Sequence, residues 1–399
     1  MTQENRYKII LIGASDFTLK SLQRLPVDVI LFNEHPPKHQ ENVFLYFNLS
    51  DNSNGNLRKE IVHIYHKFNC KCVITFYEQY LDLLAMILED PQLTSISSKA
   101  IINTRNKVYF RRILDKNTLN NVPFRPINSV DDIALFLQEV KSEIIVKPTK
   151  GAGSKGILKL HPDDTIALDS IQYEEWMYDD EFRFIAEKYI EGDEYSIETV
   201  SHQGKHEIIG IIKRQSEREN FFVGSGHISP TNMTEKFILQ VKNSIYKMLD
   251  AIELKEGAAH TELKYSNGAI YIIETQVRTG GANIWKLIKS TTGCNMRLKV
   301  IANLLQIDVP NQEKDYEYGY IRCIHSPKGI LKEFIDPSNI LEHSNIIDTH
   351  FKFRIGDFMP EITNSENRRG FIVVGANSVQ ELIEIKKMTD CFYLEIVNE

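Results

Sequence analysis

The sequence predicts a multidomain α/β protein whose later regions are of the α+β type. The first hundred residues alternate short apolar strands with helices, which is the pattern of a parallel sheet covered on both faces. The chain has 399 residues, more than one hydrophobic core usually serves. After about residue 105 the pattern changes to strands, turns and one long helix, which predicts further domains.

The N-terminal region is predicted to form a Rossmann-like layer. Its strands are apolar on both faces, as in a buried parallel sheet. Gly13 follows the first strand, but the turn at Gly13 lacks the G-x-G-x-x-G pattern, so we interpret this glycine as a tight turn and not as a dinucleotide site. The predicted strands are 7–12, 27–32 and 72–76, and the predicted helices are 17–25, 60–68 and 81–89.

Composition and charge exclude several classes of protein. The balance of 42% hydrophobic and 25% charged residues is that of a globular protein, and the net charge of −7 argues against a dedicated nucleic-acid binder. No segment has the length of a membrane span and the N-terminus lacks a signal peptide, so we expect a cytoplasmic protein that does not bind membranes. The five cysteines are odd in number and widely spread, which argues against a disulfide framework.

A lysine followed by a glycine-rich loop is the first candidate site. Lys147 follows a predicted strand at 143–146, so its ammonium group has a fixed base and suits a polyphosphate. The loop allows backbone N–H groups to approach phosphate oxygens closely, and its key residues are Gly151, Gly153, Ser154 and Gly156. The Walker A motif is absent. A flexible surface hairpin is the alternative interpretation.

Two consecutive predicted strands, 184–190 and 195–200, offer a site for a nucleoside. Adenine needs an apolar slot with one donor and one acceptor, and the backbone from Lys188 to Ile190 is able to supply both. Glu194 follows the turn between the strands, where its carboxylate can accept hydrogen bonds from ribose hydroxyls. An amphipathic strand with solvated acidic residues is the simpler interpretation of this segment alone.

The most informative segment is a predicted hairpin at 260–274 that carries Glu262 and Glu274. Asn-Gly between two alternating strands is a strong hairpin signal. We predict a three-residue loop, 266–268, which pairs Glu262 with Ile272 and places Glu274 diagonally from it on the same face. Two carboxylates on one face form a hard-oxygen site for Mg²⁺, whereas a strict two-residue turn would separate them. A solvated polar face is the alternative.

Arg278 follows the hairpin by four residues and stands beside Gly280 and Gly281. A guanidinium group at this place is able to hold a transferring phosphoryl group or a developing oxyanion. We therefore predict a catalytic role for Arg278.

The order of these segments resembles the ATP-grasp superfamily and, within it, the L-amino acid ligases, the bacilysin synthetase-like dipeptide synthetases. The resemblance covers nearly the whole chain. Its main residues, in order, are Lys107, Lys147 with the glycine-rich loop, 187–194, Glu262, Glu274 and Arg278. Its further segments are Asn106-Lys107 with Val122-Pro123, the Gly-His-x-x-Pro pattern at 226–230, and 368–373.

The resemblance implies an ATP-grasp architecture in three parts. Residues 1–104 would form the Rossmann-like domain, 105–310 the ATP-grasp domain and 311–399 a small C-terminal domain. A lid subdomain would occupy about 120–185, and the loop 151–156 would fold over bound phosphates.

The resemblance also implies ATP and two Mg²⁺ or Mn²⁺ ions as cofactors. The residues that would contact the phosphates are Lys107, Lys147 and the loop 151–156. Those that would hold the nucleoside are Glu187, Lys188, Tyr189, Ile190 and Glu194. Those that would ligate metal are Glu262, Glu274 and Gln276. Those with catalytic roles are Lys147, Arg278 and His227, of which Arg278 would stabilise the phosphorylated intermediate and His227 would help to place an amino acid.

The sequence departs from the family pattern at three places. Gln276 stands where the family usually has Asn, so its amide oxygen reaches one methylene further. Asn106 replaces the usual Asp and removes a charge. Gly224 and Ser225 precede His227 where an acidic residue is expected to meet a substrate amine.

The function implied is that of an ATP-dependent carboxylate–amine ligase. It would form a dipeptide through an acyl phosphate and release ADP and phosphate. Expected partners are ATP and amino acids, with no nucleic acid and no membrane, and a homodimer is expected. The pair Ala282-Asn283 suggests an uncrowded pocket, and a basic first amino acid is one option. The alternatives are another acceptor, such as a carrier-protein thiol or a small-metabolite amine, and a non-catalytic ATP-binding module.

We expect the substitution Glu274→Ala to abolish ADP formation and to leave the protein folded, because one of two metal carboxylates is lost. ADP release with Mg²⁺ present, together with circular dichroism, measures both effects. Unchanged turnover in this variant would contradict the metal assignment.

Overall fold

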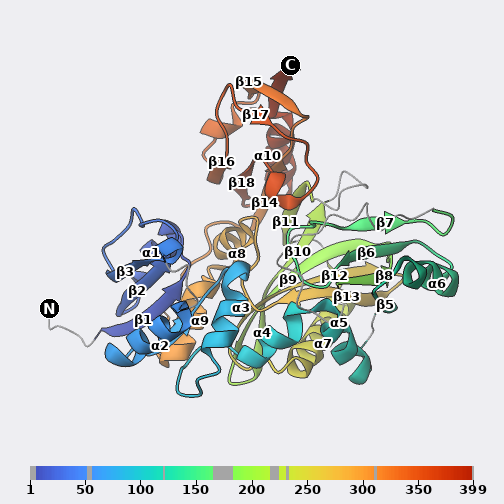
Figure 1. Cartoon of the computed structure of the whole chain (residues 1–399). Helices are drawn as coiled ribbons and strands as arrows, with labels where there is room; N and C mark the ends of the chain where they lie inside the picture. The colour runs from blue at the N-terminus through green and yellow to red at the C-terminus, as the bar shows by residue number, and fades with distance from the viewer. Residues whose placement is uncertain are drawn as a thin grey trace.

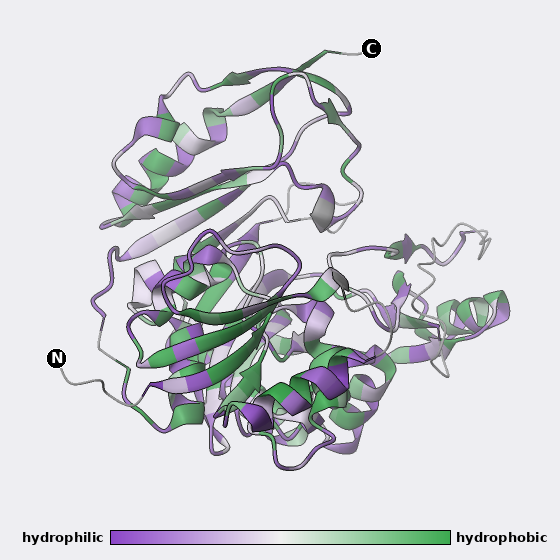
Figure 2. Cartoon of the chain, turned by 60° about the vertical axis from the view of Figure 1, so that its left-hand side comes forward, coloured by the Kyte–Doolittle hydropathy of each residue, from purple (hydrophilic) through white to green (hydrophobic). Residues whose placement is uncertain are grey.

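The structure is a computed structural model that describes residues 6–51, 56–119, 122–164, 183–215, 224–230, 233–309 and 312–397. The N-terminal part lies on the left of Figure 1, the central part on the right, and the C-terminal part at the top. The C-terminal part projects from the rest in Figure 2 as well. The combination of one parallel sheet with antiparallel sheets confirms the predicted fold class.

The N-terminal part is built on a four-stranded parallel sheet with the order β3-β2-β1-β4. Its strands are largely hydrophobic (Figure 2). The strands are β1 (Tyr7–Ile12), β2 (Val27–Asn33), β3 (Val43–Asn48) and β4 (Cys72–Ile74), and the helices are α1 (Asp16–Leu22), α2 (Leu57–Lys67) and α3 (Leu81–Ile87). Strand β3 was not predicted, because a Pro-Pro loop and no helix connects it to β2.

The central part contains most of an eight-stranded antiparallel sheet with the order β13-β12-β9-β10-β11-β14-β18-β16. Helices α7 (Glu235–Ala251), α8 (Ile284–Thr292) and α9 (Met296–Leu305) are among those that contact its strands. The strands are β9 (Asp193–His202), β10 (Lys205–Gln215), β11 (Gly226–Ser229), β12 (Gly257–Ser266), β13 (Ala269–Gln276), β14 (Tyr318–Ile324), β16 (Ile346–Phe351) and β18 (Gly370–Ala376).

A smaller sheet with the order β5-β8-β6-β7 has its own hydrophobic core under helix α6 (Val130–Val140). Its strands are β5 (Phe124–Ile127), β6 (Ile144–Pro148), β7 (Leu158–Leu160) and β8 (Phe184–Lys188). This sheet falls within the region predicted as a lid subdomain, of which residues 120–121 and 165–182 lie outside the described residues.

The C-terminal part has a separate core, in which helix α10 (Val379–Cys391) packs against β14 and β18. A three-stranded sheet lies at its top in Figure 1 and is formed by β15 (Gly329–Ile335), β17 (Phe358–Met359) and β19 (Tyr393–Val397). Strand β14 also pairs with β11 of the central part. The boundary predicted at residues 310 and 311 therefore separates strands of one continuous sheet.

Two helices connect the N-terminal part to the site. They are α4 (Ser98–Arg105) and α5 (Lys107–Lys116), and Asn106 between them caps α5 by accepting from the backbone N–H groups of Val108 and Tyr109. Both Asp and Asn are strong helix caps, so Asn106 keeps this part of the family pattern. Short 3₁₀ turns occur at 49–51, 78–80, 340–342 and 365–367.

The hairpin β12–β13 corrects the predicted register. Ser266 pairs with Ala269, so the loop has two residues, Asn267 and Gly268, both with positive φ (50° and 79°), and not the three that we predicted. The register then shifts by one residue, at Ile273, and Glu262 pairs with Glu274. This β-bulge reverses the alternation of side chains, so the two carboxylates share a face despite the two-residue turn.

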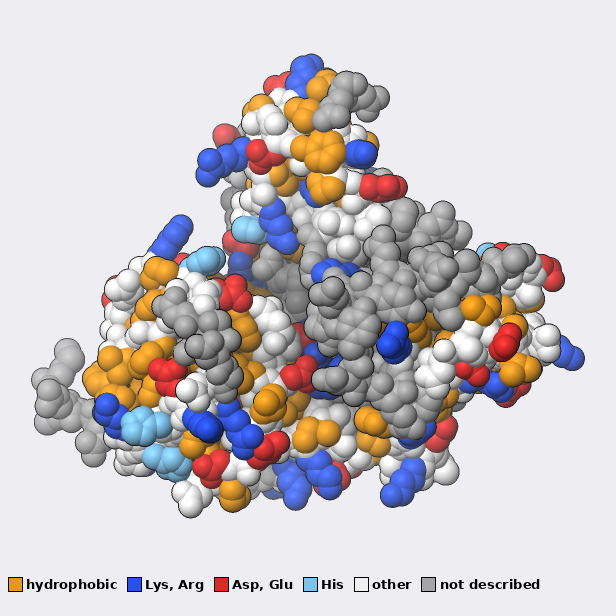
Figure 3. All heavy atoms as spheres, viewed as in Figure 1, with side chains coloured by type: hydrophobic (Ala, Val, Ile, Leu, Met, Phe, Trp, Pro, Cys, Tyr) orange, Lys and Arg blue, Asp and Glu red, His pale blue; other side chains and the backbone are white. Residues whose placement is uncertain are grey.

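No helix in the described ranges is both long and apolar enough to cross a membrane. On the face shown in Figure 3, acidic and basic side chains of the described residues are interspersed and are not gathered by sign.

We expect Gly268→Ala to lower the free energy of unfolding by about 1–2 kcal/mol, because a Cβ atom strains a left-handed backbone even though no atom lies within 4 Å of its position. Gly281 also has open space around it but lacks a positive φ, so Gly281→Ala is the matched control and should change stability by less than about 0.5 kcal/mol. Urea denaturation measures the free energy of unfolding of both variants and of the wild type. Equal stabilities would contradict the two-residue turn.

Candidate functional site

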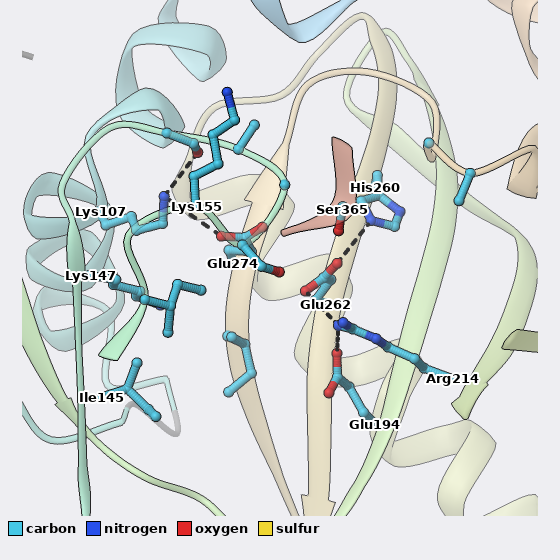
Figure 4. A pocket seen from close by; sticks show the side chains of 18 of the residues that line it. Lys107, Ile145, Lys147, Lys155, Glu194, Arg214, His260, Glu262, Glu274 and Ser365 are labelled. Carbon is cyan, nitrogen blue, oxygen red and sulfur yellow. Dashed lines mark hydrogen bonds and ion pairs between the residues drawn. The ribbon is translucent and has the colours of Figure 1, made fainter. Parts of the chain in front are cut away.

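A cavity of about 440 Å³, the main cavity below, lies between the small sheet and the large sheet. Figure 4 shows lysine side chains on one side of it and carboxylates with Arg214 on the other. The predicted site residues that line it are Lys107, Lys147, Gly151, Gly153, Ser154, Glu187, Lys188, Tyr189, Ile190, Glu194, His227, Glu262, Glu274 and Arg278. The predicted residues that do not line it are Gly156 and Gln276.

Lys107 is the first residue of α5 and is held at both ends. Its backbone N–H donates to the Thr149 carbonyl at 2.9 Å, while its Nζ lies 3.3 Å from the Gly151 carbonyl and 3.7 Å from Glu274 Oε2. Burial lowers the pKa of Lys107, and Glu274 partly offsets this. The ammonium group therefore links the glycine-rich loop to a predicted metal ligand.

Lys147 belongs to a buried cluster of three charges. Its Nζ lies 2.7 Å from Glu187 Oε2, and Arg111 Nε lies 2.7 Å from Glu187 Oε1. Arg111 is fully buried and also donates to the carbonyls of Ile272 and Ile273, at 2.5 and 2.8 Å. Glu187 therefore fixes Lys147, and Arg111 ties both to the bulge that orients Glu262 and Glu274.

The carboxylates of Glu262 and Glu274 come from adjacent strands and are both partly exposed to the main cavity. Glu262 lies 3.8 Å from Arg214 Nη1 and 3.5 Å from His260 Nε2. Burial by itself raises the pKa of Glu262, but His260 and Arg214 outweigh it and the pKa is lowered. Glu262 is therefore an anion, as a hard-oxygen metal ligand must be.

His260 and Glu198 form a buried ion pair next to Glu262 of the β12–β13 hairpin. His260 Nδ1 contacts Glu198 Oε1, and the Gly280 N–H donates to the other Glu198 oxygen at 2.9 Å. Burial lowers the pKa of His260, but Glu198 outweighs this and raises the pKa to about 9. The pair thus connects Glu262 to the glycine segment that follows Arg278.

The glycine-rich loop takes backbone conformations that suit glycine. Gly151, Gly153 and Gly156 have positive φ values of 145°, 69° and 66°. The loop also contacts the C-terminal part, because the Ser365 N–H donates to the Gly153 carbonyl at 2.8 Å. The prediction that this loop covers bound phosphates has no test in the structure, but the loop does lie over the two lysines (Figure 4).

The predicted nucleoside segment lies along one wall of the main cavity. The N–H groups of Lys188 and Tyr189 already donate to the carbonyls of Pro123 and Glu143, each at 2.9 Å. Apolar side chains that line this cavity would flank a planar base, and they are those of Val122, Ile145, Ile157, Ile190 and Ile273. Glu194, predicted to bind ribose, contacts Arg214.

Arg278 reaches toward the N-terminal part. Its Nη2 and Nε lie 2.6 and 3.0 Å from Glu78 Oε2, and Glu78 also lies 3.1 Å from Arg105 Nη1. Burial raises the pKa of Glu78, but Arg278 and Arg105 outweigh it and the pKa is lowered. Arg278 is thus fixed at the end of the main cavity that faces the N-terminal part.

Two predicted residues carry buried polar atoms without a hydrogen-bond partner among the described residues. These atoms are both ring nitrogens of His227 and the amide oxygen Oε1 of Gln276. Burial lowers the pKa of His227 well below its ordinary value, so this residue is neutral. Free buried polar groups of this kind are able to accept or donate to a ligand without first breaking a protein contact.

Sequence reasoning missed several residues of the site. They are Glu78, Arg111, Glu198, Arg214 and His260. His260 stands two residues before Glu262 on one strand, so alternation places both on one face and was a usable signal. Glu78, Arg111 and Glu198 gave no such signal, because their partners are 76 to 200 residues away or belong to other elements.

Comparison with known proteins identifies the central region. Residues 140–285 match the family model of the ATP-grasp domain. The chain contains an ATP-grasp domain. It is 22% identical over 312 residues to alanine–anticapsin ligase of Bacillus subtilis, a match that spans 72% of this chain and 66% of that ligase, slightly less than two thirds of its length.

Solved structures of other proteins share the fold of this chain over nearly its whole length. An L-amino acid ligase from Bacillus licheniformis superimposes with a TM-score of 0.80 at 21% identity, and covers 99% of this chain and 100% of its own. The biotin carboxylase domain of a 2-oxoglutarate carboxylase from Hydrogenobacter thermophilus, solved with MgADP and bicarbonate, superimposes with a TM-score of 0.71 at 14% identity, covering 99% of this chain and 92% of its own.

The residues of the main cavity fit ATP and a divalent metal, which ATP-grasp enzymes use. Glu262 and Glu274 provide carboxylate oxygens at the wall of the cavity, whereas Gln276, whose Oε1 is buried without a partner among the described residues, does not line it. The described residues hold no cluster of three or more His, Cys, Asp or Glu side chains suited to metal. Mg²⁺ commonly completes its shell with substrate phosphates, so two carboxylates are sufficient beside a nucleotide.

We expect Glu187 to make stability depend on pH in acid. Burial raises its pKa, but Arg111 and Lys147 outweigh this and lower the pKa from 4.5 to about 2. The stabilisation is therefore complete above pH 4.5 and is lost as the pH falls toward 2, by roughly 2–4 kcal/mol. Urea denaturation should show that the free energy of unfolding falls less between pH 6 and pH 3 in Glu187→Gln than in the wild type. Parallel curves would contradict the assigned charge cluster.

Proposed function

We infer that this protein is an ATP-dependent carboxylate–amine ligase of the ATP-grasp type, and that its substrates are L-amino acids. The observation that carries this proposal is the convergence on one cavity of Lys107 from helix α5 and Lys147 from the small sheet with Glu262 and Glu274 from the large sheet. The similarity to alanine–anticapsin ligase and to an L-amino acid ligase of the same fold supports the substrate class.

The chemistry needs an activated carboxylate, because a free carboxylate is a poor electrophile. Phosphorylation by ATP gives an acyl phosphate, an amine then attacks the carbonyl carbon, and phosphate leaves. A divalent metal neutralises charge on the phosphates during such a transfer. Lys107 and Lys147 add fixed positive charge from the other side, and neither has to move because Glu274 and Glu187 already position them.

Arg278 lies at the end of the main cavity, where we assign it the stabilisation of a carbonyl oxygen that gains negative charge. Arg278 is fixed by Glu78, whereas the Gly280 N–H already donates to Glu198 and is not free for this role. A preorganised donor such as this guanidinium stabilises a developing oxyanion without reorganisation. Neutral His227 lines the main cavity, and neither of its ring nitrogens has a partner among the described residues, which suits contact with an amino acid.

The alternatives differ in the acceptor. A carrier-protein thiol or the amine of another metabolite would use the same ATP site, since these acceptors meet the acyl phosphate only after it forms. A non-catalytic ATP-binding module is disfavoured, because both lysines, both carboxylates and Arg278 are present and fixed by partners. The homodimer expected from the resemblance stays a prediction.

The test is phosphate release from ATP and Mg²⁺ with a panel of amino acids, singly and in pairs, and mass identification of the product. We expect release to require an amino acid and to fall at least about a hundredfold in Arg278→Ala, in line with the loss of an oxyanion donor. Arg125→Ala is the control, since its ion pair with Glu139 lies on the surface. Release that no amino acid stimulates would contradict the proposal.

A further inference from the structure

A second cavity of about 490 Å³, the side cavity below, adjoins the main cavity. The two share Glu78 and Arg278 in their walls. The side cavity lies where the three parts of the chain meet, since its walls come from the loops after β1 and β4, the segment from the end of β13 into α8, Arg297 of α9, and strands β16 and β18. A substrate whose carboxylate is activated beside Arg278 would therefore extend into it.

The acidic side chains of the side cavity are already neutralised. Glu78 lies 2.6 Å from Arg278 and 3.1 Å from Arg105. Asp348 contacts Lys286. Neither carboxylate is available to a cationic ligand unless an internal ion pair is broken, which is costly at partly buried sites.

Arg297 is the charged residue of the side cavity whose charge is not balanced. It is only 7% exposed, and its Nη1 and Nε contact hydroxyl groups, of Thr18 at 2.6 Å and Thr279 at 3.4 Å. Among the described residues it contacts no carboxylate. Burial lowers the pKa of Arg297, partly offset by Tyr77, so the fold keeps a guanidinium there at an energetic cost.

The aromatic rings of the side cavity are occupied by cations of the chain itself. The guanidinium carbon of Arg297 lies 4.4 Å from the Trp285 ring centroid and 5.5 Å from that of Phe76. Lys286 Nζ lies 5.3 Å from the Trp285 centroid. A basic substrate would meet like charge at these rings, which disfavours the option of a basic first amino acid.

We propose that the side cavity binds a substrate carboxylate other than the one that is phosphorylated, and that Arg297 is the specificity-determining residue that recognises it. This inference rests on the proposed ligase function. Arginine pairs with carboxylates through parallel hydrogen bonds, and such charge-assisted bonds are the strong ones. The carboxylate belongs either to an acidic side chain or to the free α-carboxylate of the amino acid that supplies the amine.

The kinetic test measures phosphate release with two matched pairs of substrates. L-Glutamate and L-glutamine are compared as the amino acid that is phosphorylated, and L-alanine and L-alaninamide as the amino acid that supplies the amine, each with the other substrate fixed at a saturating concentration. In the wild type, the two members of one pair should differ in kcat/KM by roughly 10- to 100-fold in favour of the compound with the carboxylate, the range for a hydrogen bond to a charged group. A difference in the glutamate pair identifies an acidic side chain, and a difference in the alanine pair identifies the free α-carboxylate. In Arg297→Gln that difference should nearly vanish while the KM for ATP stays unchanged. If neither pair differs in the wild type, or if Arg297→Gln still discriminates, the proposal is overturned.

A structural role for Arg297 is tested by Thr18→Val. This substitution removes the hydroxyl partner from helix α1 but leaves the positive charge of Arg297 in place. Discrimination should persist in Thr18→Val. An equal loss of discrimination in both variants would mean that Arg297 only joins two parts of the fold, and would overturn the recognition role.

A binding measurement separates this proposal from the ligase function. The chain has two tryptophans, so Trp176→Phe leaves Trp285, which lines the side cavity, as the single fluorophore. When the same four compounds are titrated, the Trp285 emission should change only with the member of one pair that carries the additional carboxylate. Arg297→Gln should abolish that change. This result without phosphate release would refute the ligase function alone, whereas release without selective binding would refute the side-cavity proposal alone.

Discussion

The site depends on one backbone irregularity, the bulge at Ile273, and on the buried guanidinium of Arg111 that holds it. A regular two-residue hairpin would place Glu262 and Glu274 on opposite faces of the sheet, and one extra residue brings them together. The carbonyls of Ile272 and Ile273 both accept from Arg111, which also binds Glu187 and through it fixes Lys147. One fully buried side chain therefore sets the position of Lys147 relative to Glu262 and Glu274.

The main cavity is electrostatically balanced by the chain's own groups. Lys107 lies beside Glu274, and Arg214 lies between Glu194 and Glu262. A bound nucleotide would offer negative charge to the lysine and arginine, and a bound cation would offer positive charge to the carboxylates. Each charged side chain would then exchange one oppositely charged partner for another and would not become unpaired. Burying an unpaired charge costs several kcal/mol, and the internal pairs avoid that cost while the cavity holds no ligand.

The sequence predicted the fold class and most of the residues that line the main cavity, because glycine-rich loops, hairpin turns and apolar strands are local signals. Helices α4, α6, α8 and α9 were not predicted from their periodicity. The loop length of the β12–β13 hairpin was predicted wrongly, since the correct face of Glu274 arises from the bulge and not from the turn. Glu78 and Arg111 could not have been found, because their roles depend on partners brought from distant segments by tertiary packing.

Strand β11 is only four residues long and carries His227 between β10 and β14. Its backbone is paired on one side by residues of the C-terminal part, and that pairing shields a short strand that would otherwise end the sheet. Exposed strand edges invite association with other chains. The C-terminal part is therefore no detachable appendage. A cleavage between α9 and β14 that released it would bare strand β11, which holds His227 at the wall of the main cavity, and would favour aggregation over a truncated but working enzyme.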